Sequence, residues 1–471
     1  MSRHVVIAGG GFGGYYTAKG LERELPADVA ITLVSDVNFL LYTPLLPGAA
    51  AGTLEPRHVV VPLRERLRRT ELRVGRVTGA DPLEHTLSVE LLPGQETKIR
   101  YDQLVVALGS ISRTPPIPGL AEHGIGFKTI SEAIALRNRV VRHLETAEEI
   151  DDDEERRAYL GFVFVGGGYA GLEGIAELQD FASDALARYP RCRATGMRWV
   201  LVEAGPRVMA EIQPRLAEFA TRLMRERGIE ILVDTQVREV AEASVTLSTG
   251  EVVACRTVCW TAGVRGNPVV EHFGLPLDRG RIRCRDTMQV EGVDDVWALG
   301  DIAAIPDPAR PGQPCPPTAQ HAIRQGKLMA RNVPAVMRGE APRPFTFKTL
   351  GAFADLGRQN AVANLMGARV KGFAAWSIAR LYHLAWMPGI RRKVRLITDW
   401  TVDFWFARDT ADLGSLGHPP RLAEHVPPPS AGEGAGEGAG EGGSGGPGGG
   451  AGPGGSAAAP GSRPTDTRVA R

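Results

Sequence analysis

Cysteine is scarce in this chain of 471 residues, and the five cysteines present have no regular spacing. An odd and scattered set does not form the disulfide framework of a small secreted domain, and it fits a reducing compartment. The 10 histidines are equally scattered, without the paired spacing of metal ligands. We therefore predict neither a disulfide-stapled fold nor a metal site.

Net charge and long hydrophobic runs are also lacking. Lysine and arginine total 55 against 54 aspartates and glutamates, a net charge of +1. So neutral a chain has no basic field to hold a phosphate backbone, which excludes a dedicated nucleic-acid binder. No uninterrupted apolar run reaches the roughly 20 residues of a membrane-spanning helix. The first residues lead directly into an apolar strand, with no secretion or transit signal.

Glycine is abundant but unevenly distributed. Residues 427–471 consist almost wholly of Gly, Ala, Pro, Ser and Glu, with the repeat Glu-Gly-Ala-Gly near their start. Such a segment has no large apolar side chains to offset the entropy of ordering, so we predict a disordered tail. The preceding 420 or so residues are long enough for two to four domains.

One pattern occurs twice in this folded part. A continuous apolar run leads into a glycine turn, then a helix, then a second apolar strand. The expected strand, helix and strand cover residues 4–8, 15–25 and 30–34, and again 161–165, 172–187 and 198–202. Continuous β-branched runs are typical of parallel strands buried on both faces. The repeat therefore predicts an α/β fold with two Rossmann-like domains.

Other elements are expected around this repeat. Further strands are predicted at residues 101–110, 257–264 and 295–303. Ser131 is predicted to cap a helix that runs to residue 142, and the charged run 151–157 is interpreted as a solvated turn. Cys255 and Cys259 alternate along one strand, and we interpret them as buried hydrophobic residues and not as redox centres.

Both glycine turns have the spacing G-x-G-x-x-G of dinucleotide sites. The residues are Gly9, Gly11 and Gly14, and then Gly166, Gly168 and Gly171. The first glycine permits the tight turn, the second lets the backbone approach a pyrophosphate, and the third lets helix and strand pack closely. The helix N-terminus adds free N–H groups and a positive dipole end.

An acidic residue after the second strand of each half is expected to bind a ribose. In the second half this residue is Glu203, whose charge would also repel a 2′-phosphate and favour NADH over NADPH. Arg207, four residues later, is a group that could reach such a phosphate. In the first half the only nearby acid is Asp36, one residue later than expected.

Two nucleotide sites in one chain indicate a reaction in which two nucleotides meet. Hydride transfer from a nicotinamide to a flavin is the simplest such reaction, because it needs the two rings to approach within about 3–3.5 Å. The sequence therefore predicts an oxidoreductase that holds a flavin and NADH.

Three further stretches extend the likeness to known proteins. They are residues 42–56, which begin Tyr-Thr-Pro-Leu-Leu-Pro, Glu173 after the second glycine turn, and residues 316–326, which contain Ala-Gln and Gln-Gly. With these, the chain resembles the flavoproteins with two dinucleotide-binding domains, and among them the type II (non-proton-pumping) NADH:quinone oxidoreductases. The resemblance covers about residues 4–415.

The resemblance implies a domain plan and a set of site residues. It implies an FAD-binding domain over 1–115 and 265–345, an NADH-binding domain over 116–264, and a C-terminal membrane-association or dimer segment over 346–420. FAD would lie at the first glycine turn and NADH at the second. Further cofactor contacts would be Asp36, Ala107, Gly109, Glu203, Gly263, Asp301, Ala319 and Gln320. Glu173, beside the nicotinamide, and Gln320, near the flavin and quinone head, would be catalytic.

The chain departs from the family pattern at two positions. Ser35 stands where a ribose carboxylate is usual, and Arg324 replaces a glutamine beside the quinone. Related disulfide reductases are excluded because residues 36–60 contain no cysteine, and sulfide:quinone oxidoreductases because Cys315 alone cannot form their disulfide. Two alternatives stay open, namely a soluble NADH-dependent reductase of a ferredoxin-like protein and a non-catalytic flavin and NADH sensor.

Residues 372–412 contain four of the seven tryptophans. Within them, residues 373–387 are typical of a short amphipathic helix, and four basic residues follow between 391 and 395. Tryptophan favours the headgroup zone and basic side chains are attracted to anionic lipid, so we predict attachment to the cytoplasmic face of a membrane, where a quinone is reached. A homodimer interface is the alternative, because Trp and Arg are also enriched at protein contacts.

Overall fold

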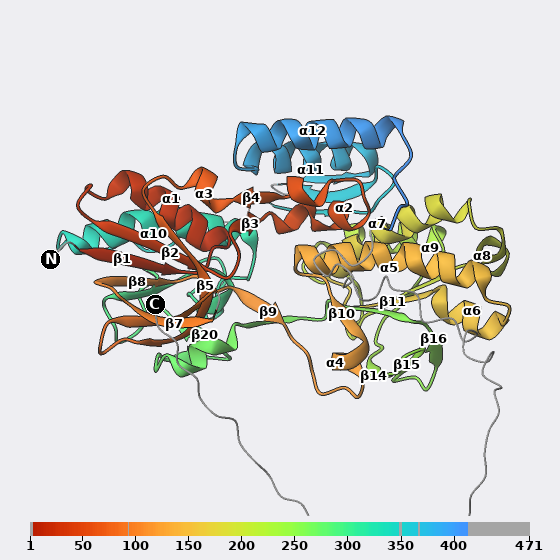
Figure 1. The fold of residues 1–471 in the computed structure, drawn as a ribbon, viewed down its shortest axis with the longest axis horizontal. Coiled ribbons are helices and arrows are strands. Elements are labelled where there is room, and N and C mark those ends of the chain that lie inside the picture. Colours follow the sequence, from red (N-terminus) through yellow and green to blue (C-terminus); the bar gives the residue numbers. More distant parts are fainter. Residues whose placement is uncertain (1–2, 93, 348–350, 366–367, 413–471) are drawn as a thin grey trace, which may run out of the picture. The chain divides into compact units, whose positions relative to one another are not determined.

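Two sheets, one mixed and one wholly parallel, organise the chain, and helices cover each of them (Figure 1). The computed structural model describes residues 3–92, 94–347, 351–365 and 368–412. The predicted tail, 427–471, lies outside these residues. All described residues belong to one compact unit, Met1–Gly414.

The first sheet has seven strands in the order β21-β8-β1-β2-β5-β6-β7. Their bounds are β1 His4–Ala8, β2 Ala30–Ser35, β5 Glu71–Asp81, β6 Thr86–Leu91, β7 Gln95–Arg100, β8 Gln103–Val106 and β21 Val296–Ala298. β1 pairs in parallel with β2 and β8, whereas β5, β6 and β7 form an antiparallel extension. Helices α1 (Phe12–Glu24) and α10 (Ala319–Met337) pack so closely that a Cβ on Gly20 would lie 2.4 Å from that of Ala330.

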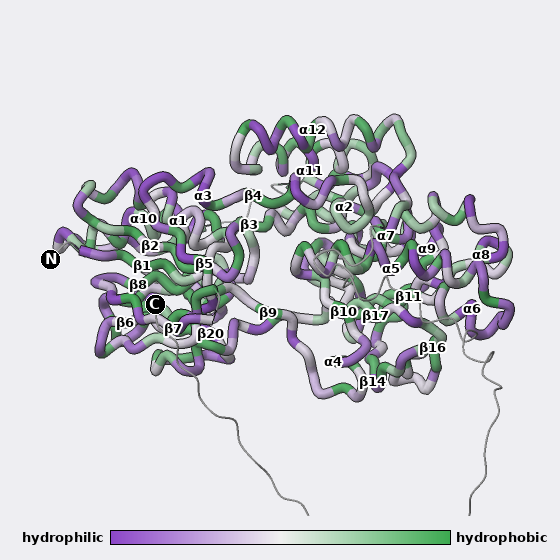
Figure 2. The backbone as a smooth tube through the Cα atoms, viewed as in Figure 1, coloured by the Kyte–Doolittle hydropathy of each residue, from purple (hydrophilic) through white to green (hydrophobic). Residues whose placement is uncertain are grey.

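The second sheet has five parallel strands in the order β10-β17-β11-β12-β13. Their bounds are β10 Gly124–Gly126, β11 Gly161–Val165, β12 Arg198–Val202, β13 Ile229–Leu232 and β17 Thr257–Trp260. The accompanying helices are α5 Ile130–Glu149, α6 Asp153–Tyr159, α7 Tyr169–Leu186, α8 Pro190–Thr195 and α9 Pro214–Glu226. Phe162 stacks on Trp199 in its core with ring centroids 4.3 Å apart. Figure 2 shows the hydrophobic residues concentrated on these strands.

Smaller elements complete this architecture. Their bounds are β3 Phe39–Leu41, α2 Leu46–Ala50, β4 Val60–Pro62, α3 Leu63–Arg66, α4 Leu120–His123, β14 Val237–Val240, β15 Ser244–Leu247, β16 Val252–Ala254, β19 Leu277–Asp278, β20 Arg281–Arg283 and β22 Ala303–Ala304. The chain crosses between the two sheets through β9 (Ser110–Ser112) and β18 (Val264–Gly266), which pair as a two-stranded antiparallel ribbon. The fold thus confirms two Rossmann-like units, with their glycine turns at the carboxyl ends of β1 and β11.

A three-stranded antiparallel sheet precedes two helices at the C-terminal end of the described chain. The bounds are β23 Gly351–Asp355, β24 Ala361–Leu365, β25 Ala368–Lys371, α11 Gly372–Trp386 and α12 Ile390–Trp405. The predicted helix at 373–387 is confirmed as α11, while the sheet and α12 were not predicted. In the described ranges, no helix is both long and apolar enough to cross a membrane.

Two local predictions are wrong. The N-cap of α5 is Thr129, not Ser131, because Thr129 and Glu132 form a reciprocal capping box. The run 151–157 is not a turn but enters α6, whose N-cap Asp152 accepts a hydrogen bond from Glu155 N at 2.8 Å. That helix is held because Arg156 is buried, with its guanidinium donating to the Ala147 and Ile150 carbonyls at the end of α5.

Candidate functional site

The first glycine turn is built for close backbone approach. Gly9 has φ +112°, and a Cβ there would lie 2.3 Å from the carbonyl oxygen of Ala107. A Cβ on Gly14 would lie 1.8 Å from the Gly9 oxygen, so only glycine fits. A Cβ on Gly11, by contrast, would meet no described atom within 4 Å. The second glycine therefore faces open space, which is where a pyrophosphate needs to approach.

The second glycine turn repeats this geometry. Gly166 has φ +107°, and a Cβ on Gly171 would lie 1.9 Å from the Gly166 oxygen. Gly168 again faces open space. Gly11 and Gly168 are the N-caps of α1 and α7 and provide no side-chain cap. Both helices thus begin inside the motif, three residues earlier than predicted, and their first N–H groups are free to bind a phosphate.

The two ribose positions differ. Glu203 follows β12, and its carboxylate accepts hydrogen bonds from Gly167 N at 2.6 Å and Gly205 N at 2.7 Å. In the first half, the residue that corresponds to Glu203 is Ser35, at the end of β2. The backbone N–H of Gly9 donates to the Val34 oxygen just as that of Gly166 donates to the Val202 oxygen, so the residue after each valine occupies the same position. The Ser35 hydroxyl is buried without a hydrogen-bond partner among the described residues. Asp36 is exposed and follows that position by one residue, as the sequence indicated.

Arg207 does not offer a free cation to the second ribose site. Its guanidinium donates to the backbone oxygens of Met209, Ala210 and Ile212 at 3.3, 2.6 and 3.1 Å. A 2′-phosphate would have to displace these bonds. The geometry therefore agrees with a site that prefers the unphosphorylated ribose.

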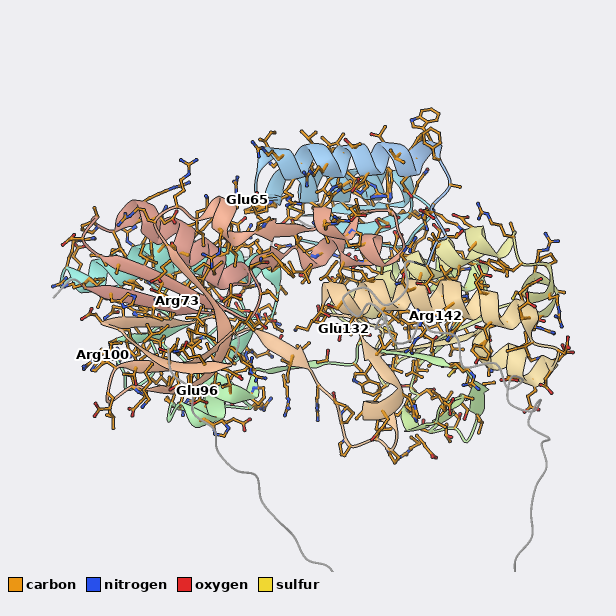
Figure 3. The ribbon with its side chains drawn as sticks, in the orientation of Figure 1. Glu65, Arg73, Glu96, Arg100, Glu132 and Arg142 are labelled. Carbon is orange, nitrogen blue, oxygen red and sulfur yellow. The ribbon has the colours of Figure 1, made fainter. Side chains whose placement is uncertain are left out.

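Asp301 belongs to a hydrogen-bond chain that crosses between the two units. Lys128 Nζ donates to Ser110 Oγ at 2.6 Å, and Ser110 Oγ donates to Asp301 Oδ2 at 2.6 Å. Burial lowers the pKa of Lys128, and the Asp301 and Glu132 carboxylates oppose that shift. Figure 3 labels Glu132 at the N-terminal end of α5, where it also accepts from the Lys128 backbone N–H at 2.7 Å.

The glycines that precede β9 and β18, together with the start of α10, surround this hydrogen-bond chain. Gly109 and Gly263 have φ +66° and +88° and face open space. Gln325 is buried and accepts a hydrogen bond from Gly300 N at 2.8 Å, which fixes the turn that presents Asp301. Ala319 is the first residue of α10 and is half-buried.

Gln320 lies where α10 meets the C-terminal sheet. Its Nε2 donates to the Gly351 carbonyl at 3.0 Å, while its Oε1 is buried and accepts no hydrogen bond from the described residues. Arg324, one turn later, lies over the rings of Phe347 and Trp386 at 4.1 and 5.1 Å. The residue that departs from the family pattern is therefore held by cation–π contacts.

Glu173 is in the first turns of α7 and is half-buried. Its Oε1 accepts a hydrogen bond from Asp355 N at 3.0 Å, so β23 holds it from the C-terminal side. Burial raises the pKa of Glu173 well above its ordinary value, and the neighbouring Asp355 and Glu177 carboxylates add to that rise. A carboxyl whose pKa is raised by its surroundings is suited to act as a general acid.

The loop after the first ribose strand contacts both C-terminal helices. Tyr42 packs edge-on against Phe12 and His383, with its hydroxyl 3.4 Å from His383 Nδ1. His58 Nδ1 lies 2.6 Å from Asp399 Oδ2. The loop therefore joins the first glycine turn to α11 and α12.

All five cysteines are buried and free, including Cys255 and Cys259 as predicted. Within the described ranges, no group of three or more His, Cys, Asp or Glu side chains is arranged to hold a metal ion.

Comparison with known proteins follows the same division of the chain. A family model described as pyridine nucleotide-disulphide oxidoreductase matches residues 3–326. The type II NADH:quinone oxidoreductase Ndh of Mycobacterium tuberculosis is 32% identical over 423 residues, covering 86% of this chain and 89% of that protein. The chain belongs to the type II NADH:quinone oxidoreductases.

Two further relatives agree with that membership. This type II oxidoreductase is 31% identical to the demethylphylloquinone reductase NdbB of Synechocystis sp., with 84% of this chain and 95% of that protein covered. The structure of NDH2 from Plasmodium falciparum in complex with NADH superposes with a TM-score of 0.80 at 18% identity, over 87% of this chain and all of that chain. The last match shows a shared fold.

Sequence reasoning missed several members of the oxidoreductase site. Lys128, Ser110 and Asp355 were not singled out, because each meets its partner only through tertiary contacts. Gln325 lies within residues 316–326, three residues after Ala322. That helical spacing places both residues on the same buried face, so its burial could have been predicted.

Proposed function

We propose that the first glycine turn binds FAD, the second binds NADH, and Glu173 and Gln320 lie beside the reacting groups. The family membership carries the activity itself: electrons pass from NADH through the flavin to a quinone without proton pumping. FAD, when bound, supplies the hydride chemistry, and this chain supplies binding, orientation and proton handling.

The pair of glycine turns is the observation that carries the proposal. In each turn the third glycine leaves no room for a Cβ, and the second glycine faces open space. The helix that follows each turn has no side-chain N-cap. A pyrophosphate fits that space, since it meets backbone N–H groups at a positive helix end. Asp301, held by Ser110, is placed to accept hydroxyl hydrogen bonds from the polyol part of FAD.

Gln320 fits the quinone end of the reaction. Its buried and unpaired Oε1 is an acceptor that a quinol hydroxyl would satisfy, and its Nε2 is already fixed by Gly351. We place the quinone head between Gln320 and the aromatic contacts of Tyr42, His383 and Trp386. A ferredoxin-like acceptor would not need such a buried amide acceptor, so the quinone is favoured.

A Glu173→Gln variant tests the role of that carboxyl. The amide keeps the hydrogen bond from Asp355 N but carries no transferable proton. We expect turnover with NADH and a short-chain quinone to fall by about 100-fold, within the range for general acid–base groups. Glu218→Gln, on the exposed side of α9, is the matched control and should retain full turnover. Unchanged turnover in Glu173→Gln at normal FAD content would contradict the proposed role.

We also propose that α11 and α12 attach the protein to the membrane that holds its quinone. Ile390, Val394, Ile397 and Trp405 follow one face of α12 and are 73%, 55%, 47% and 73% exposed. The opposite face contains Leu396, which is fully buried. Figure 2 shows hydrophobic and hydrophilic residues interleaved along this helix. Such a face suits the interface of a bilayer.

Basic residues flank this apolar face. Arg391 and Arg395 are exposed, and each would contribute about 1 kcal/mol on anionic lipid. Type II NADH dehydrogenases are membrane-associated, and we propose the cytoplasmic face as the side of attachment.

The double variant Val394→Glu with Ile397→Glu tests the membrane face. It should no longer sediment with anionic phosphatidylglycerol vesicles, because charged residues replace the inserting stripe. Leu83→Glu with Leu92→Glu, at exposed apolar positions of the first unit, should sediment normally. A double variant that still sediments, but loses a homodimer seen for the wild type, would favour the dimer interface instead.

A further inference from the structure

A polar cavity of about 400 Å³ lies between α7 and the C-terminal segment. Charged side chains from α7, α11, α12 and the segment after α12 line it, among them Glu177, Asp180, Arg380, Asp403 and Arg408. Exposed residues at its rim, such as Asp184 and Gln359, open it to solvent. Its lining is unsuited to the apolar tail of a quinone, since only Trp376 and Phe406 are aromatic.

Three buried polar atoms around this cavity lack partners among the described residues. They are Glu177 Oε2, Arg380 Nε and Arg408 Nη1. Glu177 is the most notable because the residue is only 4% exposed. Buried groups of this kind are satisfied by water, and a polar cavity of this size has room for several molecules.

Glu177 lies one helical turn after Glu173 on α7. Side chains four residues apart on a helix are neighbours, with Cβ atoms about 5–6 Å apart, a gap that one water can bridge. Glu173 accepts a hydrogen bond from Asp355 N and lies near the start of α7, the end at which we propose that NADH binds. Water in the cavity would therefore connect the surface to Glu177, and Glu177 would connect to Glu173 one helical turn away.

We propose that Glu177 and the cavity beside it are the proton inlet of this enzyme, delivering solvent protons to Glu173 for quinone reduction. This inference rests on the function proposed above. A hydride carries two electrons and one proton from NADH, whereas reducing a quinone to a quinol needs two electrons and two protons. One further proton therefore has to enter from solvent in each turnover, giving NAD⁺ and quinol as products.

The groups around Glu177 make its carboxyl suited to exchanging protons with solvent. The charged groups around it are Glu173 and Asp180 on α7, Asp355 on β23, Arg227 after α9, Arg380 on α11, Asp403 near the end of α12, and Arg408 beyond it. Burial raises the pKa of Glu177 to about 7, with Asp355 and Asp180 adding to the rise and Arg408 and Arg380 opposing it. A carboxyl with a pKa near the working pH both takes and releases protons readily.

The variant Glu177→Gln tests the inlet in the FAD-loaded enzyme. Anaerobic reduction of the flavin by NADH should keep its wild-type rate, since the hydride brings its own proton. Turnover with a short-chain quinone should fall by about 10- to 100-fold, the lower part of the range for proton-transfer groups. Formate, a small weak acid that the cavity admits, should restore part of the turnover. Glu177→Asp should retain most of it.

Infrared difference spectra between pH 6 and pH 8 give an independent readout. The wild type should show a protonated carboxyl band that titrates near pH 7 and is absent in Glu177→Gln. Loss of flavin reduction together with quinone turnover would overturn the proposal, as it would reveal a structural role. Full quinone turnover in Glu177→Gln would also overturn it. A wild type that NADH reduces but quinone does not reoxidise would instead refute the proposed function.

Discussion

We predict that one carboxylate, that of Glu203, makes the enzyme prefer NADH over NADPH, and Glu203→Gln tests this prediction. Glu203 accepts hydrogen bonds from both Gly167 N and Gly205 N, so truncation to alanine would leave two N–H groups without an acceptor. Glutamine keeps the shape and one acceptor oxygen and removes the charge, so one of the two N–H groups loses its acceptor. Because the loss of that hydrogen bond affects NADH and NADPH alike, the ratio of their kcat/KM values reports the change in charge.

The magnitude can be worked from the position of the carboxylate. At about 5 Å and an effective dielectric constant of about 20, two unit charges repel by about 3 kcal/mol. Glu203 is half-buried, so solvent screening reduces this to about 1.5 kcal/mol. The lost charge-assisted hydrogen bond to the NADH ribose weakens NADH by a similar amount. Together these changes shift the NADH-to-NADPH ratio of kcat/KM by about 100-fold.

The assay is steady-state oxidation of each nucleotide with a short-chain quinone, at low and at physiological salt. Glu239→Gln, on the exposed face of β14, is the matched control and should leave the ratio unchanged. A wild type that uses both nucleotides equally, or a Glu203→Gln enzyme with the wild-type ratio, would refute the electrostatic reasoning.

Two other substitutions have defined outcomes. Gly14→Ala should yield protein without bound FAD, because its Cβ would lie 1.8 Å from the Gly9 oxygen, whereas Gly79→Ala, with its nearest neighbour at 3.9 Å, should remain yellow. Burial alone would raise the pKa of Asp180, but the arginines around it, Arg408 foremost, hold that pKa below its usual value. Asp180→Asn should therefore lower the free energy of unfolding by about 2–3 kcal/mol in urea titrations. Asp151→Asn, at a 97% exposed side chain, should change it by less than about 0.5 kcal/mol. Equal losses in the two variants would contradict the buried network.

The glycine turns and the strands before them could be predicted because their signals are local. The apolar runs at 4–8 and 161–165 form β1 and β11 with the predicted bounds, and a glycine turn follows each strand directly. The position of Glu203 directly after β12 could also be predicted, since its distance along the chain from the turn is constrained by the fold, while its contact with a ribose stays a prediction. The sequence also showed Ser35 at the ribose position and Asp36 one residue later, but it did not show that the Ser35 hydroxyl is buried without a hydrogen-bond partner among the described residues.

The elements that were missed depend on distant partners. The helix at Asp153–Tyr159 is anchored by the buried Arg156, whose role cannot be read from a run of charges. Asp180 meets Arg358 and Arg408, which are 178 and 228 residues away in the chain. The cavity beside Glu177 exists only because these segments meet. Periodicity cannot reveal such a site, since each of its charges alone is typical of a solvated surface.

Anaerobic mixing of the FAD-loaded protein with one equivalent of NADH, followed by a short-chain quinone, tests the central claim most directly. The flavin absorbance should disappear with NADH and return with the quinone, with one quinol formed for each NADH oxidised. A flavin that NADH does not bleach, or that stays bleached when the quinone is added, would contradict an NADH:quinone oxidoreductase.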